Sequence, residues 1–323
     1  MLLYPLMTID DILAKEGAVA RAMGLAFEYR PQQLEMADAV RKALSTKTHL
    51  IVEAGTGVGK SLAYLVPLVL WARSENCRVV VATYTKALQQ QIVRKDIPFL
   101  KTVLGEFRVA LCVGGENYLC LKRFDQLRIN DLYEQAEIDP VNRLFAWSVA
   151  TRTGMRSELD FEPPPGLWSK ACREADLCFG RDCSYYKDCF YQRAKLIEQQ
   201  AQVLVANHHL FFADLATGGN VLPQHQAVVF DEAHQIEDVA TDYLGVDISN
   251  YSVRYLLDTL LSQRTRKGLL TRLKLHTHET DVAKDRVDNL RQAAENFFLN
   301  LQQVLKQEPV MRVRKPDIIP DNL

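Results

Sequence analysis

Apolar residues occur along this chain in two alternating patterns, short continuous runs and longer stretches with helical spacing. The runs are rich in valine, which is typical of strands that are buried on both faces of a parallel sheet. The stretches 9–23, 34–44 and 62–72 favour helices, and the first of them is expected to end at Gly24. Alternating strands and helices predict an α/β fold with a mostly parallel sheet and helices on both faces. The predicted strands are 49–52, 78–83, 108–113, 201–206 and 226–230.

Two parts of the chain interrupt this alternation and divide it into regions. Residues 116–200 form a mostly helical insert, and the sequence after about residue 239 is helical. We therefore expect an α/β domain built from 1–115 and 201–238, an inserted domain at 116–200, and a helical region at 239–323.

The helical region contains one strongly periodic segment. From residue 287 its apolar positions step alternately by three and four, as on one face of a helix. This pattern fits the seam of two packed helices, and it fits an amphipathic helix on any core equally well. The positions are Val287, Leu290, Ala294, Phe297, Leu301 and Val304.

The sequence EAGTGVGKS, residues 53–61, lies between the first predicted strand and the helix at 62–72. Backbone N–H groups and the positive helix end converge in such a unit, which suits a phosphate group. The segment matches a P-loop except at Ala54, where the usual pattern has glycine. Its lysine would bind the β- and γ-phosphates of ATP, its serine would ligate Mg²⁺, and its glycines would allow close backbone approach. The alternative is an ordinary glycine-rich turn. The candidate residues are Gly55, Thr56, Gly57, Gly59, Lys60 and Ser61.

A second nucleotide contact is suggested upstream, within the sequence YRPQQ at 29–33. The side-chain amide of Gln33 carries both a donor and an acceptor, so it can read the edge of an adenine. Alone this signal is weak, because a solvent-facing or helix-capping glutamine explains it as well.

The sequence Asp231-Glu232-Ala233-His234 follows the last predicted strand. In P-loop proteins an acidic residue at a strand end holds Mg²⁺, and a neighbouring carboxylate can polarise the attacking water. Asp231 and Glu232 fit these two roles. Together with the P-loop, this motif predicts a nucleotide-hydrolysing site.

The balance of charge excludes a strong overall attraction to nucleic acid, since 39 basic and 40 acidic residues give a net charge of −1. Any nucleic-acid site must be local. Thr83 ends the strand at 78–83 and Lys86 follows it. These residues suit the phosphates of a nucleic-acid backbone or, alternatively, a helix cap with a solvated lysine. No apolar run approaches the roughly 18 residues of a membrane helix, so we expect a cytoplasmic protein without a membrane partner.

The chain has seven cysteines, which in a reducing compartment argue for metal or catalysis rather than disulfides. Cys178, Cys183 and Cys189 lie close together in the insert, among aromatic and basic residues, and Cys120 precedes them. Four thiolates suit zinc or an iron–sulfur cluster, but this spacing is typical of neither, and buried inert cysteines are the alternative. Cys172 is a further cysteine near this group in the sequence, beyond the four thiolates that such a metal site needs.

Read in order, YRPQQ, EAGTGVGKS, VATYTKALQQQ, GGENYLC, the three clustered cysteines, VLVANHHLFF and VVFDEAH resemble the DinG/XPD family of iron–sulfur superfamily 2 DNA helicases, on its YoaA-like side. The resemblance covers the whole chain. It implies a RecA-like P-loop domain for ATP and Mg²⁺, with an inserted iron–sulfur domain and the start of a helical arch domain. It also implies roles for several residues: Arg30 and Gln33 at adenine; Lys60, Asp231, Glu232 and His234 in catalysis; Cys120, Cys178, Cys183 and Cys189 on a [4Fe-4S] cluster; and Thr83, Lys86 and Asn207 on single-stranded DNA.

The resemblance further implies an ATP-dependent 5′ to 3′ DNA helicase that acts on single-stranded or forked DNA, with a replication or repair protein as a possible partner. Family members continue into a second RecA-like domain, which we do not find here, so we expect an amino-terminal portion that cannot unwind DNA alone. The alternatives are a DEAH RNA helicase or remodelling ATPase, and a catalytically incomplete cluster-bearing module that binds DNA. The cysteines argue against the first alternative, and measured ATP turnover would test the second.

Overall fold

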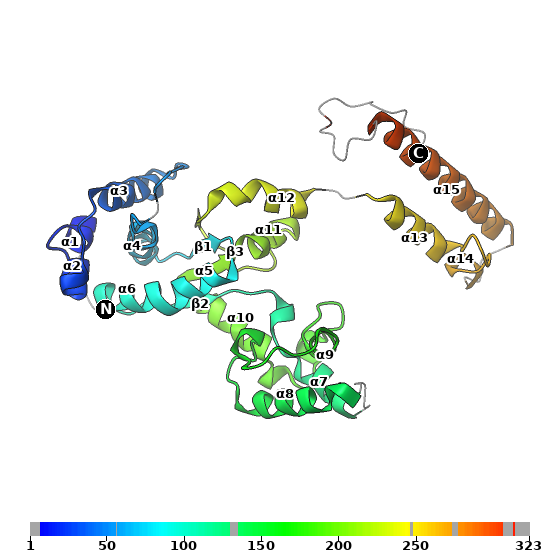
Figure 1. Cartoon of the computed structure of the whole chain (residues 1–323), viewed down its shortest axis with the longest axis horizontal. Coiled ribbons are helices and arrows are strands. Elements are labelled where there is room, and N and C mark those ends of the chain that lie inside the picture. Colours follow the sequence, from blue (N-terminus) through cyan, green and yellow to red (C-terminus); the bar gives the residue numbers. More distant parts are fainter. Residues whose placement is uncertain are drawn as a thin grey trace. The chain divides into compact units, whose positions relative to one another are not determined.

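Four parallel strands form a sheet within the described residues, in the order β2-β3-β1-β4. Figure 1 labels three of them, β1, β2 and β3, together with the helices of the chain. The computed structural model describes residues 7–55, 57–129, 135–245, 248–272, 277–305 and 313. The central strands are buried, as their valine-rich sequences predict. Four of the predicted strands are therefore confirmed: β1 (Val79–Thr83), β2 (Val109–Leu111), β3 (Val203–Asn207) and β4 (Ala227–Phe230).

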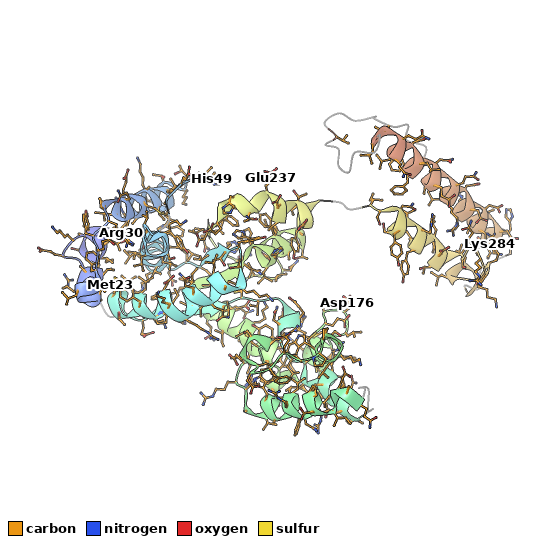
Figure 2. The ribbon with its side chains drawn as sticks, viewed as in Figure 1. Met23, Arg30, His49, Asp176, Glu237 and Lys284 are labelled. Carbon is orange, nitrogen blue, oxygen red and sulfur yellow. The ribbon has the colours of Figure 1, made fainter. Side chains whose placement is uncertain are left out.

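The prediction of a strand at 49–52 is wrong, because these residues are extended but pair with no strand in the described part of the chain. Ile51 is 97% exposed, and Leu50 and Val52 are also exposed. Figure 2 shows His49 just beyond the end of helix α3 (Pro31–Thr46). A strand forms only where a neighbour satisfies its backbone N–H and C=O groups, and this segment has none.

Helices cover both faces of the sheet, which confirms the predicted α/β layering. Alternate residues of β1 face two different cores: Val79 and Val81 contact one, and Val80 and Ala82 contact the other. The first core includes buried residues of α4 (Lys60–Ser74) and α6 (Ile97–Leu104), together with α3. The second includes buried residues of α11 (His208–Ala216) and α12 (Ile236–Leu244).

The helix expected at 9–23 is in fact two helices, α1 (Ile9–Leu13) and α2 (Ala18–Met23). They are separated at Gly17, where a Cβ atom would lie only 2.5 Å from the carbonyl oxygen of Ile12. A glycine allows the chain to fold back on itself this closely. The second helix ends at Gly24, as predicted.

The insert has a core of its own, which packs α7 (Leu121–Ile129), α8 (Ile138–Ala150) and α9 (Pro165–Ala171) together. The indole N–H of Trp168 in α9 donates to the carbonyl of Glu116 and ties this core to the chain that enters it. Helix α10 (Phe190–Gln200) then leads back to β3. These elements and the sheet belong to one compact unit, Met1–Leu244.

Glu198 is a buried carboxylate in α10. Its Oε2 atom accepts a hydrogen bond from Lys195 Nζ at 2.7 Å, while its Oε1 atom has no hydrogen-bond partner among the described residues. Burial raises the pKa of Glu198, and the Lys195 ammonium opposes this rise.

We expect the substitution Glu198→Gln to change how stability depends on pH. Above the ordinary pKa of 4.5 the unfolded chain loses this proton, whereas the folded chain holds it up to its raised pKa. Stability therefore falls as pH rises between these two values, and glutamine, which does not titrate, should remove that part of the fall. Urea unfolding across this pH range measures the effect. The exposed Glu106→Gln should keep the wild-type pH dependence, and an unchanged dependence in Glu198→Gln would contradict the expectation.

The second unit, Gly245–Leu323, contains α13 (Asn250–Leu260), α14 (Leu269–Arg272) and α15 (Thr277–Leu305) among its described residues. Val287 of α15 packs against Leu257 of α13, and Arg291 bonds to Asp258 at 3.0 Å. Of the predicted seam, Val287 thus packs between two helices, whereas Leu290 is 41% exposed.

None of the described helices is both long enough and apolar enough to cross a membrane.

Candidate functional site

The P-loop segment leads directly into α4, whose first residue is Lys60. Gly57 and Gly59 have φ angles of 84° and 82°, which are accessible to glycine and costly for other residues. The first backbone N–H groups of α4 have no partner within the helix, so they are available to a phosphate group. Gly55 and Ser61 flank this turn, and Thr56 lies outside the described residues.

Gln33 lies against the P-loop, as its proposed role at the nucleotide requires. Its Nε2 atom donates to the carbonyl of Gly59 at 2.9 Å, and its side chain is buried. A Cβ atom on Gly59 would lie 2.1 Å from this amide, so the contact requires glycine there as well. One N–H of Gln33 is used by this bond, and its oxygen and second N–H are left for an adenine edge.

Arg30 is the N-cap of α3, and Figure 2 shows it at the start of this helix. Its guanidinium pairs with Glu28 at 2.6 Å. It also lies beside the P-loop, since a Cβ atom on Gly59 would be 3.8 Å from its Nη1 atom. Arg30 and Gln33 therefore approach the same glycine.

The acidic motif lies at the carboxyl end of β4, next to the P-loop helix. The Nζ atom of Lys60 is 3.9 Å from Oε1 of Glu232, although the two residues are far apart in sequence. Glu232 has a left-handed backbone, with φ 58° and ψ 47°. Such a conformation is strained for glutamate, and residues with strained backbones cluster at active sites. His234 is exposed, and its Nδ1 atom is 3.5 Å from Oε2 of Glu232.

Tyr64 is a site residue that the sequence interpretation missed. Its hydroxyl donates to Oδ2 of Asp231 at 3.2 Å, and burial raises the pKa of Tyr64, which keeps the phenol protonated. Tyr64 lies three residues after Ser61 in α4, so both side chains are on one face of the helix. That spacing was the available signal.

Asp96 is the second missed residue, at the end of the π-helix η2 (Ile92–Asp96). Burial raises the pKa of Asp96, the nearby Ser61 hydroxyl opposes this rise, and the charge of Asp231 adds to it. Asp96 therefore lies near both Ser61 of the P-loop and Asp231 of the acidic motif.

The residues proposed to contact DNA lie at the carboxyl ends of β1 and β3. Thr83 is buried, and its hydroxyl donates to the carbonyl of Thr85 at 3.2 Å. Lys86 is exposed at the start of α5 (Lys86–Gln91), and its Nζ donates to Asn117 at 3.2 Å. Asn207 caps α11 through its Oδ1 atom, which leaves its amide NH₂ to a ligand.

His208 is a buried residue whose ring forms a hydrogen bond with the backbone. Its Nε2 atom lies 3.2 Å from the carbonyl of Ala82, and its ring packs against Phe230 and Tyr84. Burial lowers the pKa of His208, so its imidazole is neutral at pH 7. The ring thus joins the ends of β1, β3 and β4.

The four cysteines of the proposed cluster all line one cavity of about 360 Å³ in the insert. Cys120 precedes α7, Cys189 is the N-cap of α10, and Cys178 and Cys183 lie in the turns between. Basic residues line the same cavity, among them Lys122, Arg123 and Arg173.

Opposing effects act on the thiol of Cys120. Burial raises the pKa of Cys120, and the neighbouring Cys189 and Cys183 add to the rise, whereas backbone N–H groups of Arg123 and Lys122 lower it. These N–H groups belong to the first turn of α7, where the helix favours a thiolate. Cys172, by contrast, is buried next to Ser169 and does not line the cavity.

Two family models match the chain. The one described as DEAD/DEAH box helicase matches residues 30–132, and DEAD_2 matches residues 177–253. The first match contains the P-loop, and the second contains three of the cavity cysteines and the acidic motif.

Several relatives are similar over most of the chain. The ATP-dependent DNA helicase YoaA of Escherichia coli is 36% identical over 301 residues, which are 91% of this chain and 45% of YoaA. YoaA of Haemophilus influenzae is 35% identical over 75% of this chain and 38% of its own length. The ATP-dependent helicase DinG of Mycobacterium tuberculosis is 34% identical over 82% of this chain and 43% of its own. The chain therefore spans less than half the length of these relatives.

Proposed function

Because this chain belongs to the DinG/XPD family of superfamily 2 helicases, we propose that it is the ATP-binding portion of an ATP-dependent DNA helicase. The observation that carries this proposal is the approach of Lys60 to Glu232, which joins the P-loop to the acidic motif. The helicase couples ATP hydrolysis to movement along single-stranded DNA in the 5′ to 3′ direction, during repair or replication in the cytoplasm.

Different residues of the site bind the phosphates, the magnesium ion, the attacking water and the adenine. Lys60 and the α4 N-terminus hold the phosphates, while Ser61 and Asp231 hold Mg²⁺. Glu232 polarises the attacking water, and it exchanges its contact with Lys60 for one with water when the γ-phosphate takes the lysine. His234, 3.5 Å from the same carboxylate, orients Glu232. Arg30 and Gln33 contact the adenine, and the P-loop segment from Gly55 to Gly59 wraps the phosphates.

Calorimetry with ATP and Mg²⁺, followed by an ATPase assay with and without single-stranded DNA, tests this function. The 323-residue chain should bind Mg-ATP, turn it over slowly and separate no strands, because the charge that develops in hydrolysis is met by arginines outside the P-loop domain. An absence of nucleotide binding would overturn the proposal. Fast DNA-stimulated turnover that is lost in Glu232→Gln would show that the site is complete without them.

We also propose that Cys120, Cys178, Cys183 and Cys189 hold a [4Fe-4S] cluster. Their shared cavity supports this proposal, whereas no three His, Cys, Asp or Glu side chains in the described part of the chain lie close enough together to hold a metal ion. Four thiolates are the usual ligands of such a cluster. The bound cluster would hold the turns of the insert together, and the basic side chains around the cavity would balance its negative charge.

Single-stranded DNA crosses the carboxyl ends of β1 and β3 in this proposal. Lys86 and the amide of Asn207 contact phosphates, and buried Thr83 holds the turn that presents Lys86. Exposed Tyr84, which lies beside His209, offers a ring on which a base can stack.

Replacing Lys86 by alanine should weaken binding of single-stranded DNA and make it less dependent on salt. Each phosphate contact contributes about 0.7 to the slope of log K against log salt for single strands, so the slope should fall by about that amount. Fluorescence anisotropy at several salt concentrations measures it. Lys101→Ala, at the opposite end of the sheet, is the matched control, and equal effects of the two substitutions would contradict the proposed path.

A further inference from the structure

Asp96 has a buried carboxylate oxygen that nothing in the proposed mechanism uses. Its Oδ2 atom has no hydrogen-bond partner among the described residues. An acceptor left in this state costs free energy, and such atoms are rare in native proteins. The residue ends the π-helix η2, and π-helices are rare elements that occur frequently at functional sites.

The π-helix explains why an acidic side chain lies here. Ile92 and Ile97 are both buried and are five residues apart, a spacing that a π-turn places on one face. Helix η2 packs against α4, which begins with the P-loop lysine and serine. Asp96 is thereby directed at the first turn of α4 rather than at solvent.

Three side chains lie near Asp96 on that side. Burial raises the pKa of Asp96 and of Tyr64, the nearby Ser61 hydroxyl lowers both pKa values, and Tyr64 donates to Oδ2 of Asp231 at 3.2 Å. The two proposed magnesium ligands, Ser61 and Asp231, are therefore joined through a tyrosine and face a common third carboxylate. Ser61 can ligate a cation through its oxygen only if its proton points elsewhere, and Asp96 provides the acceptor.

We propose that Asp96 is a positioning residue for the magnesium ion of the ATP site. The Asp96 carboxylate accepts a hydrogen bond from the Ser61 hydroxyl, so that the lone pairs of the serine oxygen face the ion. Tyr64 holds the second ligand, Asp231, through its own hydrogen bond. This inference rests on the proposed ATP function, and it adds a residue that would not touch nucleotide or water. Outer partners of metal ligands typically affect metal affinity about 10- to 100-fold.

The test compares Asp96→Asn with wild type in Mg²⁺ titrations at fixed ATP, with bound ATP measured by equilibrium dialysis. The variant should need about 10-fold or more additional Mg²⁺ for half-maximal ATP binding. Its affinity for ATP without Mg²⁺ should be unchanged, because Lys60 and the α4 N-terminus remain. Asp38→Asn, at a partly exposed carboxylate of α3 that pairs with Arg41, should behave as wild type.

Two further results separate this role from a structural one. Ser61→Ala and Asp96→Asn should not be additive, because they disrupt the same bond, and additive losses would overturn the inference. Asp96→Ala should melt at or above the wild-type temperature, since it removes an unpaired buried oxygen. A lower melting temperature with an unchanged Mg²⁺ requirement would also overturn it. If wild type binds no Mg-ATP at all, the proposed function itself fails, which is a different outcome.

Discussion

Replacing Cys183 by serine is expected to remove the iron from the purified protein. Anaerobically prepared wild type should be brown and carry about four irons per chain, because a [4Fe-4S] cluster is held by four thiolates. Loss of one thiolate opens the site, and the free energy of metal binding that folds the insert is lost with it. Iron analysis, the visible absorption spectrum and proteolysis of the insert measure these effects.

Cys172→Ser is the matched control for this experiment. Cys172 lies in the same insert, where its backbone forms an antiparallel β-bridge with Leu119, the residue before Cys120. It does not line the cavity. Its replacement should leave the iron content unchanged. Colourless wild-type protein with stoichiometric zinc would rule out the cluster, and iron retained in Cys183→Ser would rule out this set of ligands.

Replacing Lys60 by alanine is expected to abolish measurable binding of Mg-ATP. A hydrogen bond to a charged group contributes about 1.5 to 3 kcal/mol, and Lys60 would contact two phosphates, so the Kd should rise about 100-fold or more. Isothermal calorimetry gives the Kd, and circular dichroism shows whether the fold is kept. The exposed Lys42→Ala on α3 should bind ATP as wild type does.

The same calorimetry separates the roles of Lys60 and Glu232, whose approach supports the proposed function. Glu232→Gln should still bind Mg-ATP, because the glutamate acts on water rather than on the phosphates. Binding that survives in Lys60→Ala would place the nucleotide elsewhere on the protein.

The strands that could be predicted were those whose neighbours are also in the described chain. A continuous run such as Val79–Thr83 is apolar on both faces, and only the middle of a sheet can bury it. The run at 49–52 is also short and mostly apolar, but this pattern does not say whether a partner strand exists. Its exposure in the structure reflects that missing partner.

The site was predictable where one motif carries one function, as in the P-loop and the acidic motif. It was not predictable where packing decides. Tyr64 reads as a core residue of an apolar helix, and only its hydrogen bond to Asp231 marks it as part of the site. Asp96 gives no periodic signal, because the π-turn before it shifts the helical register. The distance in sequence between Cys120 and Cys178 likewise hides their shared cavity.

The outer edge of β4 has a practical consequence for work with this polypeptide. Its apolar sequence, Ala-Val-Val-Phe, is half-buried, and no described strand pairs with its free edge. Unpaired backbone groups beside apolar side chains form a template on which a second molecule can add a strand. Preparations should therefore self-associate as concentration rises. Light scattering across a dilution series would detect this, and dilute handling would limit it.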